Sequence, residues 1–177
     1  GITVYSSTLV NKGLEMIEAS RLFDVPEDKI EVIINRQSIV HSLVEFKDGS
    51  VFAQLASSDM RLPIKFALEH PSHSTSTIVE KLDLLKISTL HFERLSLDRF
   101  PMLRFAIKAI KRGNIYPTIL NAANEVAVGL FLEDKISFLD IERIVEEALD
   151  DTIFDKFLNG PLTIPKIMSV DELVRIH

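Results

Sequence analysis

The sequence predicts an α+β fold: a β-sheet with flanking helices, then a linker, then a C-terminal α-helical bundle. Three observations support this prediction. Short β-favouring runs surround a helical pattern over residues 1–69, residues 70–77 are rich in Pro, Ser and Thr, and several segments after residue 96 repeat apolar residues at helical spacing. We therefore expect three parts: residues 1–69, a linker over 70–95, and a helical part over 96–177.

The first part begins with a predicted strand over residues 2–4 and a predicted helix over 9–23. Ser7 and Thr8, which lie between the two, are residue types that cap helix N-termini, and apolar residues then recur at helical spacing as far as Leu22. A turn-rich stretch over 24–28 ends this helix. The apolar run over 30–34 predicts a well-buried strand.

Residues 39–55 carry the signal of a β-hairpin, because Asp48-Gly49 lies between two apolar, β-favouring runs. A two-residue turn there predicts three cross-strand pairs on one apolar face: Phe46 with Val51, Val44 with Ala53, and Ser42 with Leu55. His41 falls on the other face, so we expect it to face a cleft or solvent.

The remaining elements are predicted to be mainly helical. Pro63 suits the first position of a helix that runs to about Glu69, and one strand is expected within 82–92. Apolar periodicity predicts helices over 97–112, 118–132 and 138–149, with Gly113-Asn114 ending the first of them. A weaker helix is expected over 171–176, after Pro165.

Composition excludes several classes of function. The 177 residues include no Cys, which removes disulfides, thiolate metal sites and Cys nucleophiles. A net charge of −6 has the wrong sign for a protein that binds a nucleic-acid backbone, and the only local basic group is Lys108, Lys111 and Arg112. No apolar run spans a bilayer and no signal peptide is recognisable. We expect neither a nucleic-acid nor a membrane partner.

The segment 6–15 concentrates hydroxyl, amide, ammonium and carboxylate groups at a predicted helix start. Backbone N–H groups and the helix dipole there suit a phosphate, with Asn11 and Lys12 in the first turn. Glu15 lies on the same side one turn later, where it suits a hard divalent cation. Spacing alone favours a simpler interpretation, in which Ser or Thr caps the helix and Lys12 pairs with Glu15.

Three further groups are weaker candidates. Ser38 and His41 form one, although a lone strand His is more often structural. Met60 and Arg61 lie in a loop that is either a lid or a solvated turn. The third group predicts a buried hydrogen-bond network on one helix face: Asn121, Asn124 and Glu125. No nucleotide-binding fingerprint is present.

Five segments in one order and spacing resemble a known enzyme family. They are 6–15, which contains Asn11-Lys12-Gly13-Leu14-Glu15, then 37–42, 48–55, Asp59-Met60-Arg61, and Leu120-Asn121-Ala122-Ala123-Asn124-Glu125. Together they resemble the 1-deoxy-D-xylulose 5-phosphate reductoisomerases of non-mevalonate isoprenoid biosynthesis. The resemblance covers essentially the whole chain.

The resemblance implies conversion of 1-deoxy-D-xylulose 5-phosphate, a phosphorylated sugar, to 2-C-methyl-D-erythritol 4-phosphate. It implies an NADP-dependent oxidoreductase that uses NADPH and either Mg²⁺ or Mn²⁺, forms a homodimer, and works in the bacterial cytoplasm or a plastid-type organelle. It also implies residue roles: Ser6 and Asn11 on the phosphate side, Lys12 at the substrate hydroxyls, Glu15 as one of three metal carboxylates, and Ser38, His41 and Met60 around the substrate pocket. Lys12 and Glu15 are thus the expected catalytic residues.

Family members are more than twice this length. They begin with a Rossmann-type domain that binds NADPH, and they supply two further metal carboxylates from an Asp-x-Glu motif before the position of Gly1. We therefore expect this chain to be the second half of such an enzyme and to be inactive alone. Two alternatives remain: a dimerisation or scaffold module without catalysis, and a helical interaction domain in which the cluster at 6–15 only caps a helix.

The sequence departs from the family pattern at a few positions near the expected site. Tyr5 precedes Ser6 where Asn or Asp is usual, Asn35-Arg36 replaces His-Pro, and Ser58 replaces Pro. None of these positions is an expected substrate or metal residue. Arg36 would add a positive charge near the phosphate-handling part of the site.

Overall fold

The computed structural model describes residues 4, 7–75 and 77–177, which divide into two compact units. The helical unit comprises the described residues up to Val32 together with Ser96–His177, and the hairpin unit comprises the described residues of Ile33–Leu95. The α+β class is confirmed, since helices and two small antiparallel sheets make up the structure. The boundary between Leu95 and Ser96 coincides with the predicted start of the helical part, whereas the other boundary falls between Val32 and Ile33 rather than at residue 69. The expected functional domains stay a prediction.

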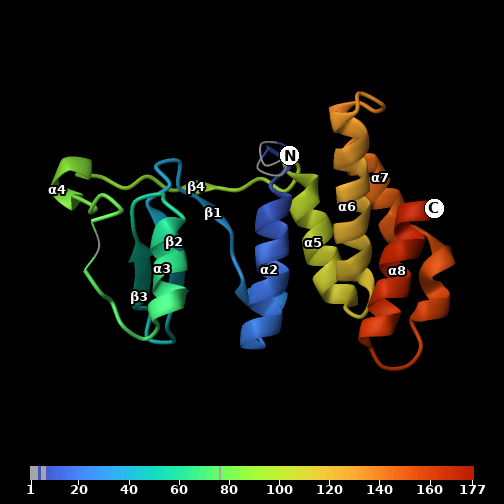
Figure 1. Cartoon of the computed structure of the whole chain (residues 1–177), viewed down its shortest axis with the longest axis horizontal. Helices are drawn as coiled ribbons and strands as arrows, with labels where there is room; N and C mark the ends of the chain where they lie inside the picture. The colour runs from blue at the N-terminus through green and yellow to red at the C-terminus, as the bar shows by residue number, and fades with distance from the viewer. Residues whose placement is uncertain (1–3, 5–6, 76) are drawn as a thin grey trace. The chain divides into compact units, whose positions relative to one another are not determined.

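The helical unit is built around α6 (Tyr116–Leu132), which packs against α5 (Pro101–Arg112), α7 (Phe138–Asp150) and α8 (Ile164–Ile176), as Figure 1 shows. α6 is largely apolar, and several of its residues are fully or almost fully buried: Ile119, Leu120, Ala122, Ala123, Ala127 and Val128. A helix that is apolar on most sides belongs in the middle of a bundle. α2 (Val10–Phe23) packs against α5 at one side of this unit.

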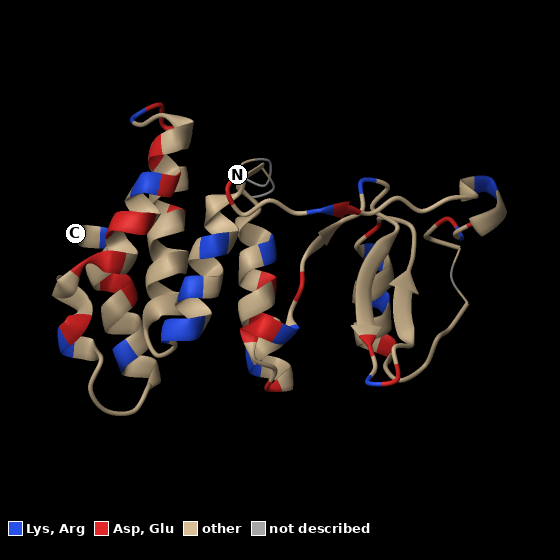
Figure 2. Ribbon diagram, turned by 180° about the vertical axis from the view of Figure 1, so that it is seen from behind, with Lys and Arg blue, Asp and Glu red and all other residues tan. Residues whose placement is uncertain are grey.

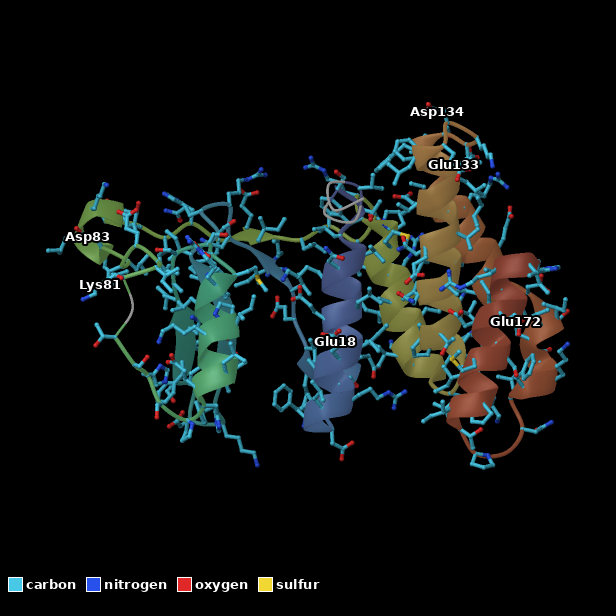
Figure 3. All side chains as sticks on the ribbon, in the orientation of Figure 1. Glu18, Lys81, Asp83, Glu133, Asp134 and Glu172 are labelled. Atoms are coloured by element: carbon cyan, nitrogen blue, oxygen red, sulfur yellow. The ribbon has the colours of Figure 1, made fainter. Side chains whose placement is uncertain are left out.

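Local sequence signals account for most helix ends. Gly113 and Asn114 adopt φ values of 64° and 47°, so they end α5 as predicted. α6 ends before Glu133 and Asp134, which are labelled in Figure 3. α8 is longer than predicted, because Pro165 stands in its first turn rather than before the helix, where its missing N–H costs no hydrogen bond.

Charged residues divide between two neighbouring helices. Figure 2 shows basic residues along α5 and acidic residues along α7. At the ends of these helices, Lys108 Nζ lies 2.6 Å from Asp150 Oδ1 and Arg112 Nη2 lies 3.2 Å from the same atom. Lys111 Nζ lies 3.8 Å from Glu27 in a short 3₁₀ helix, η1 (Glu27–Lys29). The basic group noted in the sequence is therefore paired within the protein.

The predicted buried network on α6 is wrong. Asn124 is fully buried, yet neither atom of its amide has a hydrogen-bond partner among the described residues. Asn121 instead donates to Glu125 over 3.0 Å at the surface, and Glu125 also accepts from Arg175 of α8 over 2.7 Å. Asn121 and Asn124 lie only about 60° apart around the helix, but Asn124 alone is fully buried, so the three side chains do not join in one buried network.

The hairpin unit contains β2 (Val40–Glu45) paired with β3 (Val51–Leu55), in a register one residue away from the predicted one. Val44 is opposite Phe52 and Glu45 is opposite Val51. The loop has three residues rather than two: Phe46 N donates to Ser50 O over 2.8 Å, and Gly49 takes φ 85°. A turn followed by a left-handed Gly is the usual three-residue hairpin loop.

The register change moves β3 by one position relative to β2, which exchanges the faces of its side chains. Phe52 therefore shares a face with Val44 and Phe46, and the rings of Phe46 and Phe52 pack edge to face with centroids 5.0 Å apart. These residues stay accessible within the described part of the chain, and Phe52 is 68% exposed.

The rest of the hairpin unit consists of short strands and helices. β1 (Ile33–Ile34) pairs with β4 (Glu93–Arg94), so the strand predicted over 30–34 is shorter and more exposed than expected. α3 (Arg61–Glu69) begins two residues before Pro63, and α4 (Leu84–Ile87) is capped by the Asp83 carboxylate.

The strand predicted over 2–4 lies outside the described residues apart from Val4, which is helical. Among the helices described, none is both long and apolar enough to cross a membrane.

The N-terminus of α7 makes a pH-dependent contribution to stability. The Asp140 carboxylate accepts hydrogen bonds from Ser137 Oγ and Ser137 N over 2.6 and 2.9 Å, and it also accepts from Arg143. These bonds lower the pKa of Asp140 to about 2. Its stabilising effect is therefore complete above the unfolded-state pKa of about 4 and is lost as the pH falls toward about 2.

Asp140→Asn should lower the urea midpoint of helix unfolding at neutral pH, and the difference from the wild type should shrink as the pH falls from about 5 to about 2. Circular dichroism during urea unfolding measures both midpoints. The matched control is Glu146→Gln on the exposed side of the same helix, which should change the midpoint little. A difference that stays constant over this pH range would show that the carboxylate does not act through its ionisation.

Candidate functional site

α2 presents three polar side chains on its exposed side. Asn11, Lys12 and Glu15 are exposed, whereas Val10 and Gly13 are buried against the helical unit. This division follows from helical geometry, because residues three and four apart lie on one side of a helix. The face predicted from the sequence therefore exists in the structure.

Lys12 and Glu15 form an ion pair within this face. Lys12 Nζ donates to Glu15 Oε2 over 2.6 Å, and their side chains are 45% and 56% exposed. An exposed pair of this kind contributes about 0–1 kcal/mol to stability. The pairing predicted by the simpler interpretation is thus present, but it is weak enough for either group to exchange its partner for a ligand.

The N-cap residue of α2 is Leu9 rather than Ser or Thr, and Leu9 makes no side-chain capping hydrogen bond. Thr8 Oγ1 instead donates to Val4 O over 3.2 Å. Ser6, an expected phosphate-binding residue, lies outside the described residues.

Leu9 adopts a left-handed backbone conformation, with φ 57° and ψ 20°. A non-glycine residue in this region costs on the order of 1 kcal/mol, and such strain is held by the surrounding packing. Here the neighbours Thr8 and Val10 are buried on both sides of Leu9. The chain therefore enters α2 through a fixed bend at Leu9, two residues before Asn11.

Ser38 lies at the end of a turn in the hairpin unit and also adopts a left-handed conformation, with φ 52°. Its N–H donates to Asn35 O over 3.0 Å, which closes the turn. The Asn35 side chain holds both ends: Oδ1 accepts from Ile39 N and Val40 N, and Nδ2 donates to His91 O over 2.9 Å. Sequence analysis missed this role, although Asn before a turn is a typical signal of such bonds.

Two further side chains tie the same turn to residues 89–93. Gln37 donates to Thr89 O over 2.8 Å and accepts from His91 N over 2.9 Å. Arg36 makes a two-bond ion pair with Glu93 over 2.5 and 2.9 Å, and this pairing raises the pKa of the guanidinium. The extra positive charge at position 36 is therefore neutralised by Glu93 across the β1–β4 pair.

His41 is the extra residue of a β-bulge in β2. Val40 is opposite Leu55 and Ser42 is opposite Gln54, so His41 has no partner residue in β3. Its Nε2 lies 3.2 Å from Ala56 O. A carbonyl accepts only, so Nε2 carries the proton in this contact, and in the neutral ring Nδ1 is left as an acceptor. Bulges redirect single side chains and are common beside active sites.

Met60 is 72% exposed at the start of α3, between two residues that form an ion pair. Arg61 Nη2 lies 2.5 Å from Asp59 Oδ2, and Arg61 Nε and N also donate to Asp59. The hydrogen bonds from Arg61 lower the pKa of Asp59 to about 2. Asp59 is therefore ionised at any physiological pH, and the pair fixes the backbone that carries Met60.

The expected site residues fall into two groups. Asn11, Lys12 and Glu15 share one helix face of the helical unit, whereas Ser38, His41 and Met60 belong to separate elements of the hairpin unit. No group of three or more His, Asp or Glu residues that could hold a metal ion occurs among the described residues. A hard cation takes about six oxygen ligands, so Glu15 can supply one ligand of a metal site but not the site.

Comparison with known proteins identifies the family. The family profile of the DXP reductoisomerase C-terminal domain matches residues 55–177. The chain therefore belongs to the DXP reductoisomerase C-terminal domain family, as the sequence resemblance indicated.

Particular relatives agree with this assignment. The chain is 49% identical over 180 residues to the 1-deoxy-D-xylulose 5-phosphate reductoisomerase of Acetivibrio thermocellus, and the match covers 98% of this chain and 46% of the relative. The solved structure of the Zymomonas mobilis enzyme in complex with NADPH is 42% identical with a TM-score of 0.87, and the match covers 99% of this chain and 45% of that one.

A DOX-P reductoisomerase solved with NADPH, fosmidomycin and magnesium is also 42% identical, with a TM-score of 0.93, and the match covers 99% of this chain and 44% of that one. The chain thus spans less than half the length of each of these relatives.

Asn35→Ala should loosen the turn that carries Ser38, because it removes two acceptor contacts and two donor contacts, to Gln37 Oε1 and His91 O, at a cost of about 1–3 kcal/mol. Amide hydrogen exchange should show reduced protection at Ile39 and Val40. Asn11→Ala, on the exposed face of α2, serves as the control and should leave both amides unchanged. Unaltered exchange at both amides in Asn35→Ala would mean that the Asn35 side chain does not hold the turn.

Proposed function

We propose that this chain acts in an NADPH- and divalent-metal-dependent reductoisomerase that converts 1-deoxy-D-xylulose 5-phosphate to 2-C-methyl-D-erythritol 4-phosphate. The observation that carries the proposal is the exposed α2 face with Asn11, Lys12 and Glu15, in a chain of the DXP reductoisomerase C-terminal domain family. Relatives that bear the name of this enzyme, and neighbours solved with NADPH, fosmidomycin and magnesium, support it.

Each group on α2 has a distinct task in this proposal. Asn11, together with Ser6, binds the substrate phosphate. Lys12 donates hydrogen bonds to substrate hydroxyls, and its charge balances the anionic substrate. Glu15 provides one carboxylate to Mg²⁺ or Mn²⁺, which polarises substrate oxygens as a Lewis acid when it is bound. Because the Lys12–Glu15 pair is exposed and weak, a ligand can replace it at little cost.

In this proposal the hairpin unit supplies further residues that contact the substrate. Ser38 lies in a turn that the hydrogen bonds of Asn35 stabilise, and His41 lies in a β-bulge. The backbone around each residue therefore fixes its position. His41 offers Nδ1 as an acceptor while Nε2 faces Ala56 O. Met60 provides an apolar edge, carried by the Asp59–Arg61 pair.

The remaining parts of the proposal concern the whole protein. NADPH is bound mainly by residues other than those of this chain, which carries no dinucleotide-binding fingerprint. The protein works as a homodimer in the bacterial cytoplasm or a plastid-type organelle, without a nucleic-acid or membrane partner. The net charge of −6 is consistent with the absence of a nucleic-acid partner.

A second candidate function is a dimerisation or scaffold module without catalysis. The exposed apolar side chains on one face of the hairpin favour it, since Val44 is 56% exposed, Phe46 46% and Phe52 68%. Exposed apolar groups that lie close together mark interaction surfaces. The two candidates differ in what they require of Glu15, which a scaffold does not use.

Glu15→Gln in the protein at its full natural length should lower kcat/KM and raise the Mn²⁺ concentration for half-activation by about 10–100-fold or more, because it removes a charged ligand. Thermal stability should change by no more than about 1 kcal/mol, since the Lys12–Glu15 pair is exposed. Steady-state NADPH oxidation and thermal unfolding measure the two effects.

The matched control is Glu18→Gln, the next exposed carboxylate on α2, labelled in Figure 3. It should leave both the rate and the metal dependence unchanged. Wild-type kinetics in Glu15→Gln would refute the metal-ligand role, and so would an equal loss in both variants.

The isolated chain of 177 residues should show no NADPH oxidation with substrate and Mn²⁺. Its described residues contain no cluster of three or more His, Asp or Glu side chains that could hold the metal, and Glu15 alone supplies only one ligand. The same sample can be sedimented with and without Mn²⁺. A dimer that does not respond to the metal would favour the scaffold function, whereas turnover well above background would contradict the prediction of inactivity.

A further inference from the structure

The buried side of α2 meets α5 at Gly13, where the two backbones come very close. A Cβ atom placed on Gly13 would lie 2.7 Å from Ala106 Cβ, 3.7 Å from Met102 O and 3.9 Å from Leu103 Cδ1, all on α5. Carbon atoms in contact prefer a separation of about 3.5–4.0 Å. Ala106 is fully buried, and its methyl group has no rotamer that would move it away. A side chain at position 13 therefore requires the helices to separate.

This contact also determines the direction of the polar face of α2. Each residue of an α-helix is rotated by about 100° from the one before it, so Asn11 and Glu15 each lie about 160° from Gly13, on opposite sides. These two side chains are therefore about 40° apart and point almost directly away from α5. A change in the distance or rotation between the helices at Gly13 would move both groups together.

A second helical glycine shows that close packing is not a general property of glycine in this protein. Gly129 lies within α6, and a Cβ atom placed there would meet no atom within 4 Å. Glycine is the least favourable helix residue after proline, because its backbone loses the most freedom. Gly129 could carry a methyl group without conflict, whereas Gly13 could not.

We propose that Gly13 is a positioning residue for the substrate- and metal-binding face of α2, acting through its contact with Ala106 of α5. The inference rests on the proposed function, because Gly13 places the groups that this function assigns to the phosphate and the cation. A methyl group at position 13 would push α2 away from α5 by about 1 Å. A misplacement of about 1 Å can lower an enzymatic rate by about 100-fold.

The test is an exchange of one methyl group between the two helices. Gly13→Ala, Ala106→Gly and the double variant are made in the protein at its full natural length. Gly13→Ala should lower kcat and raise the Mn²⁺ concentration for half-activation by at least about tenfold. The double variant should recover to within about threefold of the wild type, because the methyl group on α2 then occupies the space vacated on α5.

A thermal melt separates positioning from simple destabilisation. The double variant has a glycine within α5, so its melting temperature should stay below that of the wild type although its activity returns. If Gly13 acted only through stability, activity would follow the melting temperature. Gly129→Ala is the matched control, and it should keep wild-type kinetics while its melting temperature rises.

Wild-type kinetics in Gly13→Ala would overturn the inference, and so would a folded double variant that is no more active than Gly13→Ala. If Gly13→Ala does not fold, a folded double variant with activity supports the inference, and one without activity overturns it; failure of the double variant to fold also overturns it. A wild-type protein without reductoisomerase turnover would instead refute the proposed function and, with it, this role for Gly13.

Discussion

The close approach of α2 to α5 is the constraint on which the candidate site depends. Gly13 and Ala106 bring the two helices together, and α5 in turn packs against α6, the apolar centre of the helical unit. The helix that carries Asn11, Lys12 and Glu15 is thereby attached, through α5, to the buried apolar centre of that unit. The polar face can then remain exposed without losing its position, because the opposite face is fully packed.

The candidate residues of the hairpin unit are held by another means. Ser38 depends on hydrogen bonds from the side chains of Asn35 and Gln37, and His41 depends on an irregular strand pairing. Leu9 and Ser38 share one property, a left-handed backbone at a residue that is not glycine. Positive φ values at non-glycine residues also occur at helix ends and turns outside the expected site, at Asp24, Ser88, Asn114 and Asp134. At Leu9 and Ser38 the surrounding contacts compensate for the strain.

Many charged side chains of the described residues form ion pairs with an oppositely charged side chain close by. Arg36 with Glu93, Arg61 with Asp59, and Lys108 with Asp150 each neutralise a charge near the surface. The Lys12–Glu15 pair has the same form and has no third partner in the described contacts. Because the pair is exposed and joins only two groups, either group can exchange its partner for a ligand with little rearrangement.

The sequence by itself determined the helices after residue 96, the hairpin, the exposed polar face of α2 and the family, because apolar periodicity, turn residues and ordered motifs depend on neighbours along the chain. Only the tertiary structure decided the hairpin register, the bulge at His41, the unpaired amide of Asn124 and the role of Asn35. These features arise from contacts with residues elsewhere in the fold or from a one-residue choice of loop length. Gly13 shows the difference most directly: the sequence places a glycine within a helix, and only the position of Ala106 explains why it is needed.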